Sequence, residues 1–432
     1  MGPDILILVL SAGIVGSAVG CFTGIVPGIH VNTLAALMLA AYPAIEEAVS
    51  GFAEPEYVPI LVSCCIMSAS AVHSFVDFVP SAFIGAPDAD DALTVLPAHR
   101  LLLQGEGMTA VRAAAVGSAV GAGAALALAV PIQWILLQGA SDILDRLTLG
   151  VIIVTLAVIV LSSDRRLISL LLALIAGALG FAVMEMGIPC SGIMGESTLL
   201  FPMLTGLFGI PPLLEESGDA DVPEQVDWGE DPVGPGPGLK GVLTGCVAGW
   251  FPGITATAGA ALASAVSKER DPAKFISLTS SIGTVTAVFA VVTLSVSGSG
   301  RSGTSLVVKE IIGDGLEGFC SEAFVLILFS IAVASAIGYA VTISAGKMMS
   351  RLVDAVPAEL LKNAVLALMF GLVLALTGPW GLAVLAVSAF IGMLPPELGV
   401  ARVCLSACLL VPTVLTQIGL SDSLCGALGW PI

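Results

Sequence analysis

Two short motifs place a helix-breaking proline and polar residues inside apolar sequence. Residues 27–33 read Pro-Gly-Ile-His-Val-Asn-Thr, and residues 252–257 read Pro-Gly-Ile-Thr-Ala-Thr. Proline cannot continue an incoming helix, so a new helix is expected to start inside the apolar region with unpaired amide groups. Such a start attracts an anion, unless the motif only kinks a packed helix. The expected anion-binding residues are Pro27, Gly28, His30, Asn32, Thr33, Pro252, Gly253, Thr255 and Thr257.

Carboxylates within apolar sequence form a second candidate site. Asp77 lies in an apolar run, where a charge at the bilayer centre costs roughly 2.5–3.5 kcal/mol and is usually functional. Asp88 follows Gly-Ala-Pro, a sequence typical of a broken helix. We expect the break to expose the Asp88 carboxylate to a sodium ion or a proton. These two residues are the expected ion-coupling residues. His73 precedes Asp77 by one helical turn, and we expect the two to pair.

A third candidate site is the small, polar stretch 297–304, which reads Ser-Gly-Ser-Gly-Arg-Ser-Gly-Thr. Arg301, next to Ser302, is suited to clamp a carboxylate or phosphate with two parallel hydrogen bonds. The alternative interpretation is an ordinary exposed loop.

The composition indicates a membrane protein. The 432 residues are 57% hydrophobic and only 11% charged, which is too apolar for a water-soluble domain. The net charge of −18, without any basic stripe, argues against nucleic-acid binding. Acidic, lysine-poor polar segments are typical of a halophilic source. The nine cysteines lie in or beside apolar runs, so we expect buried thiols and neither disulfides nor a zinc site.

The fold class predicted is an all-α polytopic membrane protein with broken or re-entrant helices and roughly 12–14 membrane segments. We interpret the first run as a membrane span and not as a removed signal, because it lacks a basic start and a cleavage site. The better candidate spans are 5–26, 57–79, 110–136, 147–161, 167–186, 199–214, 275–296, 323–344, 364–377, 382–393 and 403–420.

An acidic linker divides the chain into two membrane repeats, residues 1–214 and 239–432. The linker, 215–238, carries eight acidic residues and ends in Gly-Pro-Gly-Pro-Gly, which predicts disorder. When residues 20–37 are placed over 245–262, nine of eighteen positions agree, including the proline and both flanking glycines. A cytoplasmic linker with an odd number of spans in each half puts twelve basic residues inside and three outside. The second half is then an inverted-topology repeat of the first.

The motifs also carry a family resemblance. The stretches 24–33, 83–88, 92–97, 105–107 and 200–214 resemble the TctA family, the large membrane subunit of tripartite tricarboxylate transporters. The resemblance implies an archaeal-type, divergent permease in the cell membrane that moves carboxylates with an ion gradient. It also implies a binding protein and a small membrane subunit as partners, although a halophile without a periplasm can work without them. The sequence departs from the family pattern at His30 and in residues 88–97, which bears on the substrate.

Three functions follow. The first is secondary transport of a di- or tricarboxylate, coupled to sodium or protons and needing no other cofactor. The second is movement of a lipid-linked phosphate, such as polyprenyl phosphate, between leaflets. The third is an intramembrane enzyme that uses His73 and Asp77, but no third catalytic group is evident in the sequence. We therefore expect a transporter and not an enzyme, with the anion and membrane lipids as partners; a homodimer and an accessory protein are left open.

Overall fold

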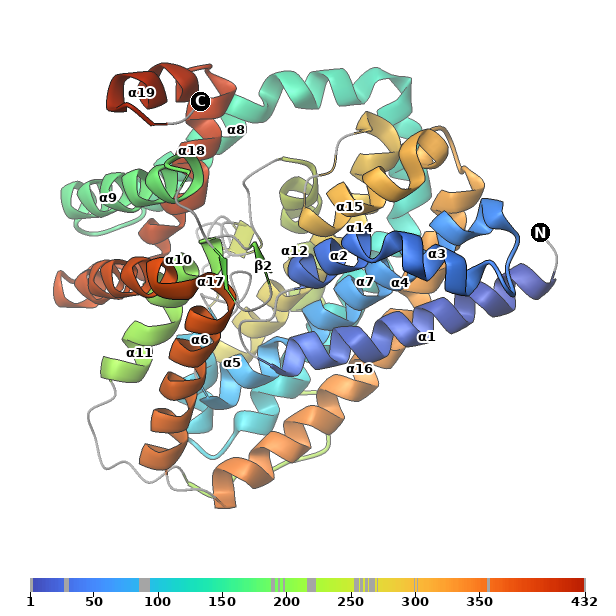
Figure 1. Cartoon of the computed structure of the whole chain (residues 1–432). Helices are drawn as coiled ribbons and strands as arrows, with labels where there is room; N and C mark the ends of the chain where they lie inside the picture. The colour runs from blue at the N-terminus through green and yellow to red at the C-terminus, as the bar shows by residue number, and fades with distance from the viewer. Residues whose placement is uncertain are drawn as a thin grey trace.

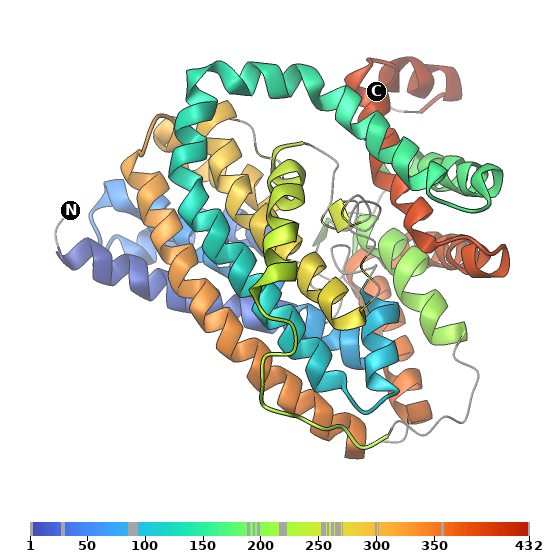
Figure 2. The same ribbon diagram turned by 180° about the vertical axis from the view of Figure 1, so that it is seen from behind.

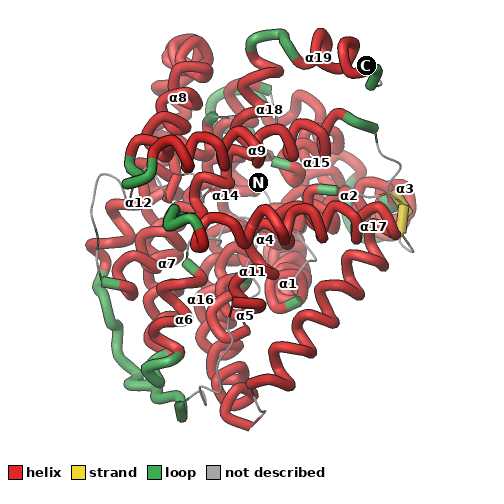
Figure 3. Tube along the Cα trace, turned by 90° about the vertical axis from the view of Figure 1, so that its left-hand side faces the viewer, coloured by secondary structure: helices red, strands yellow, loops and turns green. Residues whose placement is uncertain are grey.

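The structure is almost entirely helical (Figures 1 and 3). The computed structural model describes residues 3–26, 31–84, 94–187, 191–192, 195–196, 199–215, 223–251, 256, 259–260, 263, 269, 271–298, 300, 302–355 and 358–430. The described part of the first half contains α1 (Pro3–Ile25), α2 (Val31–Ala40), α3 (Tyr42–Val49), the 3-10 helix η1 (Pro55–Tyr57), α4 (Val58–Val76), α5 (Phe78–Ile84), α6 (Val95–Leu102), α7 (Gly107–Ile135), the π-helix η2 (Leu136–Ala140), α8 (Ser141–Leu161), α9 (Arg166–Glu185), an antiparallel pair of two-residue strands, β1 (Ser191–Gly192) and β2 (Gly195–Glu196), α10 (Leu200–Leu204), the π-helix η3 (Thr205–Gly209) and α11 (Ile210–Glu215).

The second half repeats the pattern of long apolar helices separated by short ones. Its described elements are α12 (Pro235–Trp250), α14 (Pro272–Ser297), α15 (Gly303–Ile312), the 3-10 helix η4 (Gly313–Leu316), α16 (Glu322–Ala355), α17 (Ala358–Glu397), the 3-10 helix η5 (Arg402–Ser406), α18 (Ala407–Gln417) and α19 (Ser421–Leu428).

Within the described ranges, seven helical stretches are long and apolar enough to cross a membrane. They are Asp4–Ile25, Pro55–Ile84, Gly107–Leu161, Arg166–Glu185, Pro272–Ser297, Glu322–Ala355 and Lys362–Glu397, and the bent pair α18–α19 makes an eighth if it is counted as one span. The outward faces of α9 and α17 expose large apolar side chains such as Leu174 and Phe390, which water would not tolerate in such number. The predicted fold class, an all-α polytopic membrane protein, is confirmed.

Two of these stretches are interrupted by glycines with left-handed backbone torsions. Gly139 has φ +102° between α7 and α8, and Gly378 has φ +68° within α17. Residues with a Cβ rarely adopt these torsions, so the chain changes direction there. Both breaks coincide with gaps between predicted spans, 110–136 and 147–161 in one case and 364–377 and 382–393 in the other.

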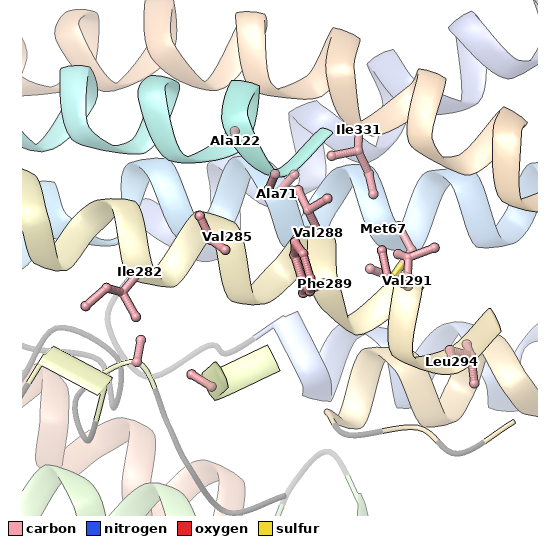
Figure 4. Packing of buried hydrophobic residues seen from close by; sticks show 14 of the residues in the cluster. Met67, Ala71, Ala122, Ile282, Val285, Val288, Phe289, Val291, Leu294 and Ile331 are labelled. Atoms are coloured by element: carbon pink, nitrogen blue, oxygen red, sulfur yellow. The ribbon is translucent and has the colours of Figure 1, made fainter. Parts of the chain in front are cut away.

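The centre of the molecule is a bundle of helices from both halves, built around α4 and α14. These two helices are the most buried of the candidate spans. Their apolar side chains interlock with those of α7 and α16, and Figure 4 shows Met67, Ala71, Val288 and Ile331 in this core. A helix surrounded on all sides by other helices can be apolar or small all round, as α4 is.

Rows of glycine bring α1 onto α4 and α12 onto α14. An added Cβ on Gly20 would overlap the carbonyl oxygen of Ala69, and one on Gly245 would lie 3.1 Å from the carbonyl oxygen of Ile282. The same shifts, 225 residues between α1 and α12 and 213 between α4 and α14, relate a carbonyl contact of each glycine pair: the carbonyls are those of Cys65, Ala69 and His73 on α4 and of Leu278, Ile282 and Thr286 on α14. The rows are Gly16, Gly20 and Gly24 on α1 and Gly241, Gly245 and Gly249 on α12.

The end of the bundle against which residues 223–234 lie is called the linker end below. Helix α7 runs away from the linker end, because Gln225 of the linker accepts a hydrogen bond from Gly107 at the start of α7. Two contacts show that α14 runs in the same direction. Ser118 donates to the carbonyl of Ser280 at 3.4 Å, and further along the Gln133 amide donates to Ser295 Oγ at 3.0 Å. The two helices are therefore parallel.

Helices α4 and α16 run toward the linker end. Lys347, near the end of α16, faces the linker. Ser68 of α4 and Ser330 of α16 both lie beside Gly13, and nearer the ends of these two helices Phe75 packs against Gly338 and accepts a hydrogen bond from Thr342. The corresponding helices α4 and α14 thus run in opposite directions. Helix α1 is parallel to α4, and α12 is parallel to α14, so α1 and α12 also run in opposite directions.

A second group of helices, α8–α11 with α17–α19, lies to one side of the central bundle (Figure 1). Here also a first-half helix packs on a second-half helix. An added Cβ on Gly180 of α9 would overlap the backbone of Cys408 of α18, and one on Gly392 of α17 would lie 2.5 Å from the Leu207 carbonyl oxygen. Both groups therefore hold the halves together through close helix contacts.

The described part of the linker is held in place, whereas the sequence predicts disorder for it. Asp227 accepts hydrogen bonds from Nε and Nη2 of Arg112, at 2.6 and 2.9 Å, and lies 3.7 Å from Lys347 Nζ. Gln225 accepts from Gly107 N. Figure 2 shows this yellow-green segment passing across α7 and α16. One of the acidic residues that suggested a solvated chain, Asp227, instead finds basic partners on both halves.

Candidate functional site

The two halves meet at the starts of α2 and α15. Asn32, in the first turn of α2, accepts a hydrogen bond from the backbone N–H of Thr304 at 3.0 Å. Gly303 permits this approach, because an added Cβ there would lie 2.7 Å from the side chain of Asn32. An amide that follows the first Pro-Gly motif thus binds the start of a helix that follows the Ser-Gly stretch.

Ser302 forms the cap of α15. Its hydroxyl accepts from Ser305 N at 3.2 Å, and Ser305 Oγ accepts from Ser302 N at 2.8 Å, which is a complete capping box. The same hydroxyl lies 3.0 Å from Thr304 Oγ1. Three hydroxyl groups and the Asn32 amide therefore gather at one helix start, as hydrogen-bonding groups of both halves.

The end of α14 and the far end of α15 lie at a charged group on the other side from this helix start. Gly298, which ends α14, lies near the carboxylate of Glu317. Lys309, on the last turn of α15, pairs with Asp314 at 2.8 Å and with Glu317 at 3.0 Å. The Lys309 ammonium lowers the pKa of the exposed Asp314 carboxyl below its ordinary value. The start of α15 consequently points inward, away from this charged outer group.

His73 and Asp77 lie at the end of α4, as the sequence predicts. Both are buried, and His73 Nε2 lies 3.9 Å from Asp77 Oδ2. On its other side, His73 Nδ1 lies 3.0 Å from Thr23 Oγ1, whose hydroxyl donates to the Gly20 carbonyl at 3.1 Å. The tautomer of His73 sets which of Nδ1 and Thr23 Oγ1 donates in this contact. The other ring nitrogen, Nε2, faces the carboxylate of Asp77.

Each glycine-bearing helix ends beside a stretch of helical chain that continues past it, α1 beside the junction of α4 and α5 and α12 beside the interior of α14. Gly24, near the end of α1, packs against Val76 and the backbone of Asp77, seven residues before α5 ends. Gly249 of α12 packs against Phe289, eight residues before α14 ends. The described ends of α1 and α12 therefore lie within the bundle and not at its surface.

The structure brings some of the sequence-predicted residues near one another. Asn32 binds the backbone N–H of Thr304, two residues after Ser302, and Asp77 meets His73 across one turn of α4. Thr33 lies in α2. The other predicted residues lie outside the described residues: Pro27, Gly28, His30, Asp88, Pro252, Gly253, Thr255, Thr257 and Arg301.

Sequence reasoning missed Thr23, Thr304 and Trp250. Thr23 was visible as the one hydroxyl in the last turn of α1 before the proline, and Trp250 directly precedes the second Pro-Gly motif. Thr304 binds through its backbone, for which a sequence gives no signal. Among the described residues, no three His, Cys, Asp or Glu side chains cluster as metal ligands, and eight cysteines are free thiols.

Long apolar helices, breaks within the bundle and polar groups gathered at buried helix starts define a polytopic membrane protein of the transporter class. Residues 10–406 match the tripartite tricarboxylate transporter TctA family, so the chain belongs to this family. It is accordingly a multi-pass membrane transporter of the tripartite tricarboxylate type. Members of this family usually work with the other subunits of such transporters.

One relative is an uncharacterized protein of Methanocaldococcus jannaschii. It is 28% identical over 302 residues, which cover 68% of this chain and 71% of the relative. No solved structure matches the chain.

Proposed function

We propose that the protein is a secondary transporter that moves an organic anion, a di- or tricarboxylate, across the membrane with a sodium or proton gradient. The observation that carries the proposal is the hydrogen bond between Asn32 and Thr304, because it places polar groups of both halves at one buried helix start. The positive dipole end of a helix start favours a carboxylate.

The proposal includes two inverted-topology repeats that enclose this site. It is supported by the opposite directions of α4 and α14 and by the constant shifts between the two glycine rows. In such an arrangement, the helix breaks of the two halves approach a shared site from opposite sides, and movement of one half against the other exposes that site alternately.

Ion coupling is assigned to the end of α4. Asp77 and His73 are buried next to the last turn of α1, directly before the first Pro-Gly motif. A cation bound at Asp77 therefore acts on the same helix break that leads to Asn32. The second half has Thr286 and Ala290 at the corresponding places, so the coupling group belongs to one half only.

The test is uptake by the purified full-length chain in liposomes. Radiolabelled citrate, succinate and malate are offered with an imposed sodium or proton gradient, and accumulation of at least one of them is expected. The Asp77→Asn chain should bind the same anion but lose gradient-driven accumulation, whereas Asp145→Asn, a change at an exposed residue of α8 outside the central bundle, should retain it. Movement of polyprenyl phosphate between leaflets without any carboxylate uptake would replace this function by lipid transport.

A further inference from the structure

Trp250 is the last residue of α12, after which the chain leaves the helix. Phe251 is extended, with φ −87° and ψ 125°, and a proline follows it. The side chain of Trp250 is buried, with 3% of the residue exposed. Its indole Nε1–H has no hydrogen-bond partner. A buried donor without an acceptor lowers the stability of the fold, because the donor has lost its hydrogen bond to water and has formed no hydrogen bond in its place.

This donor differs from the other unpaired groups of the interior. The remaining buried side-chain atoms without a partner, among the described residues, are six serine hydroxyls. A serine hydroxyl on a helix can rotate toward the carbonyl one turn earlier. The indole N–H is fixed in the plane of a rigid ring and is a donor only, so an acceptor has to come to it.

The polar backbone groups around Trp250 are satisfied by α14. Thr293 Oγ1 donates to the Gly249 carbonyl at 3.0 Å, and Thr286 Oγ1 donates to the Gly245 carbonyl at 3.4 Å. The carbonyls of Gly245 and Gly249 near the end of α12 thus accept hydrogen bonds from threonines of α14. The indole N–H of Trp250, at the end of the same helix, has no partner.

The two halves differ at this position. The shift of 225 residues that relates α12 to α1 places Trp250 over Ile25, which has no polar atom in its side chain. The second half therefore adds a hydrogen-bond donor where the first half adds none. The donor faces no acceptor of the described chain, and the cargo proposed above carries anionic oxygens.

We propose that the indole N–H of Trp250 donates a hydrogen bond to a carboxylate oxygen of the transported anion, which makes Trp250 a substrate-binding residue. This inference rests on the proposed function. A hydrogen bond to a charged oxygen from a preformed, water-excluded donor favours the anion over a neutral molecule of the same shape. Trp250 accordingly contributes to affinity for the anion and not to ion coupling.

The experiment compares uptake kinetics of the wild-type full chain with Trp250→Phe and with a chain that carries 3-benzothienylalanine at position 250. The second replacement keeps the bicyclic ring but lacks the N–H, so it controls for lost packing. Both should raise the KM for the transported carboxylate about tenfold, with Vmax within about twofold. Trp380→Phe, a change at an exposed tryptophan, should leave KM unchanged.

Tryptophan fluorescence gives a second readout. Anion addition should change the emission of the wild type and of Trp380→Phe but not that of Trp250→Phe. Uptake by the wild type with an unchanged KM in both position-250 chains would overturn this inference alone. A wild-type chain that takes up no carboxylate would overturn the proposed function, and the inference with it.

Discussion

Asn32 and Thr304 lie 272 residues apart in the chain and are joined by one hydrogen bond of 3.0 Å. The acceptor is an amide side chain at the start of α2, and the donor is a backbone N–H at the start of α15. The first helix follows the Pro-Gly motif, and the second follows the Ser-Gly stretch. The contact therefore couples the first helix break of one half to the polar stretch of the other, where the shared anion site is proposed.

Replacing Asn32 tests this contact. Asn32→Ala leaves the Thr304 N–H without its acceptor, and we expect a loss of about 1 kcal/mol in stability together with slower uptake. Asn32→Asp keeps an acceptor and adds a charge that the helix start favours, so stability should be retained while the KM for a carboxylate rises through repulsion. Thermal unfolding in detergent and liposome uptake measure the two effects. Equal KM in the wild type and Asn32→Asp would place the anion elsewhere.

The contact between Asp227 and Arg112 predicts that the linker is fastened to α7. Asp227→Asn removes the negative charge from the bidentate pair that Asp227 forms with Arg112. In a double-mutant cycle with Arg112→Gln, the coupling free energy between the two side chains should be about 0.5–1 kcal/mol. Hydrogen–deuterium exchange of residues 223–229 should be faster in both variants. Glu230→Gln, a change at an exposed neighbour, serves as the control. Unchanged exchange in Asp227→Asn would show that the ion pair does not hold the segment.

The same carboxylate sets a pH dependence. The Arg112 guanidinium lowers the pKa of Asp227 from its ordinary value of 3.8 to about 2. A lowered pKa in the folded state stabilises the fold above the ordinary value, and this stabilisation is lost as the pH falls from 3.8 toward about 2. The difference in melting temperature between the wild type and Asp227→Asn should therefore be constant from pH 7 to 5 and shrink below pH 4. A difference that already shrinks near pH 6 would assign the effect to another group.

The sequence predicts the helices well because apolar runs and glycine breaks are local features. Gly139 and Gly378 divide long helices at the places where polarity and glycine suggested, and His73 and Asp77 pair because they lie one turn apart on α4. Partners from distant segments are not encoded locally. The linker reads as disordered because its carboxylates are visible in the sequence, whereas the distant Arg112 that binds one of them is not.

A pair of glycines in α7 tests how closely the central helices must approach. An added Cβ on Gly117 would lie 2.7 Å from the Ser277 Cα of α14, whereas Gly123, six residues later, has no heavy atom within 4 Å of such a Cβ. Gly117→Ala should therefore force the helices apart at a cost of about 1–3 kcal/mol. Gly123→Ala should be neutral or gain about 0.5–1 kcal/mol, because alanine is the better helix former. Melting temperatures of the two purified variants decide the matter, and equal values would mean that α7 and α14 do not pack through Gly117.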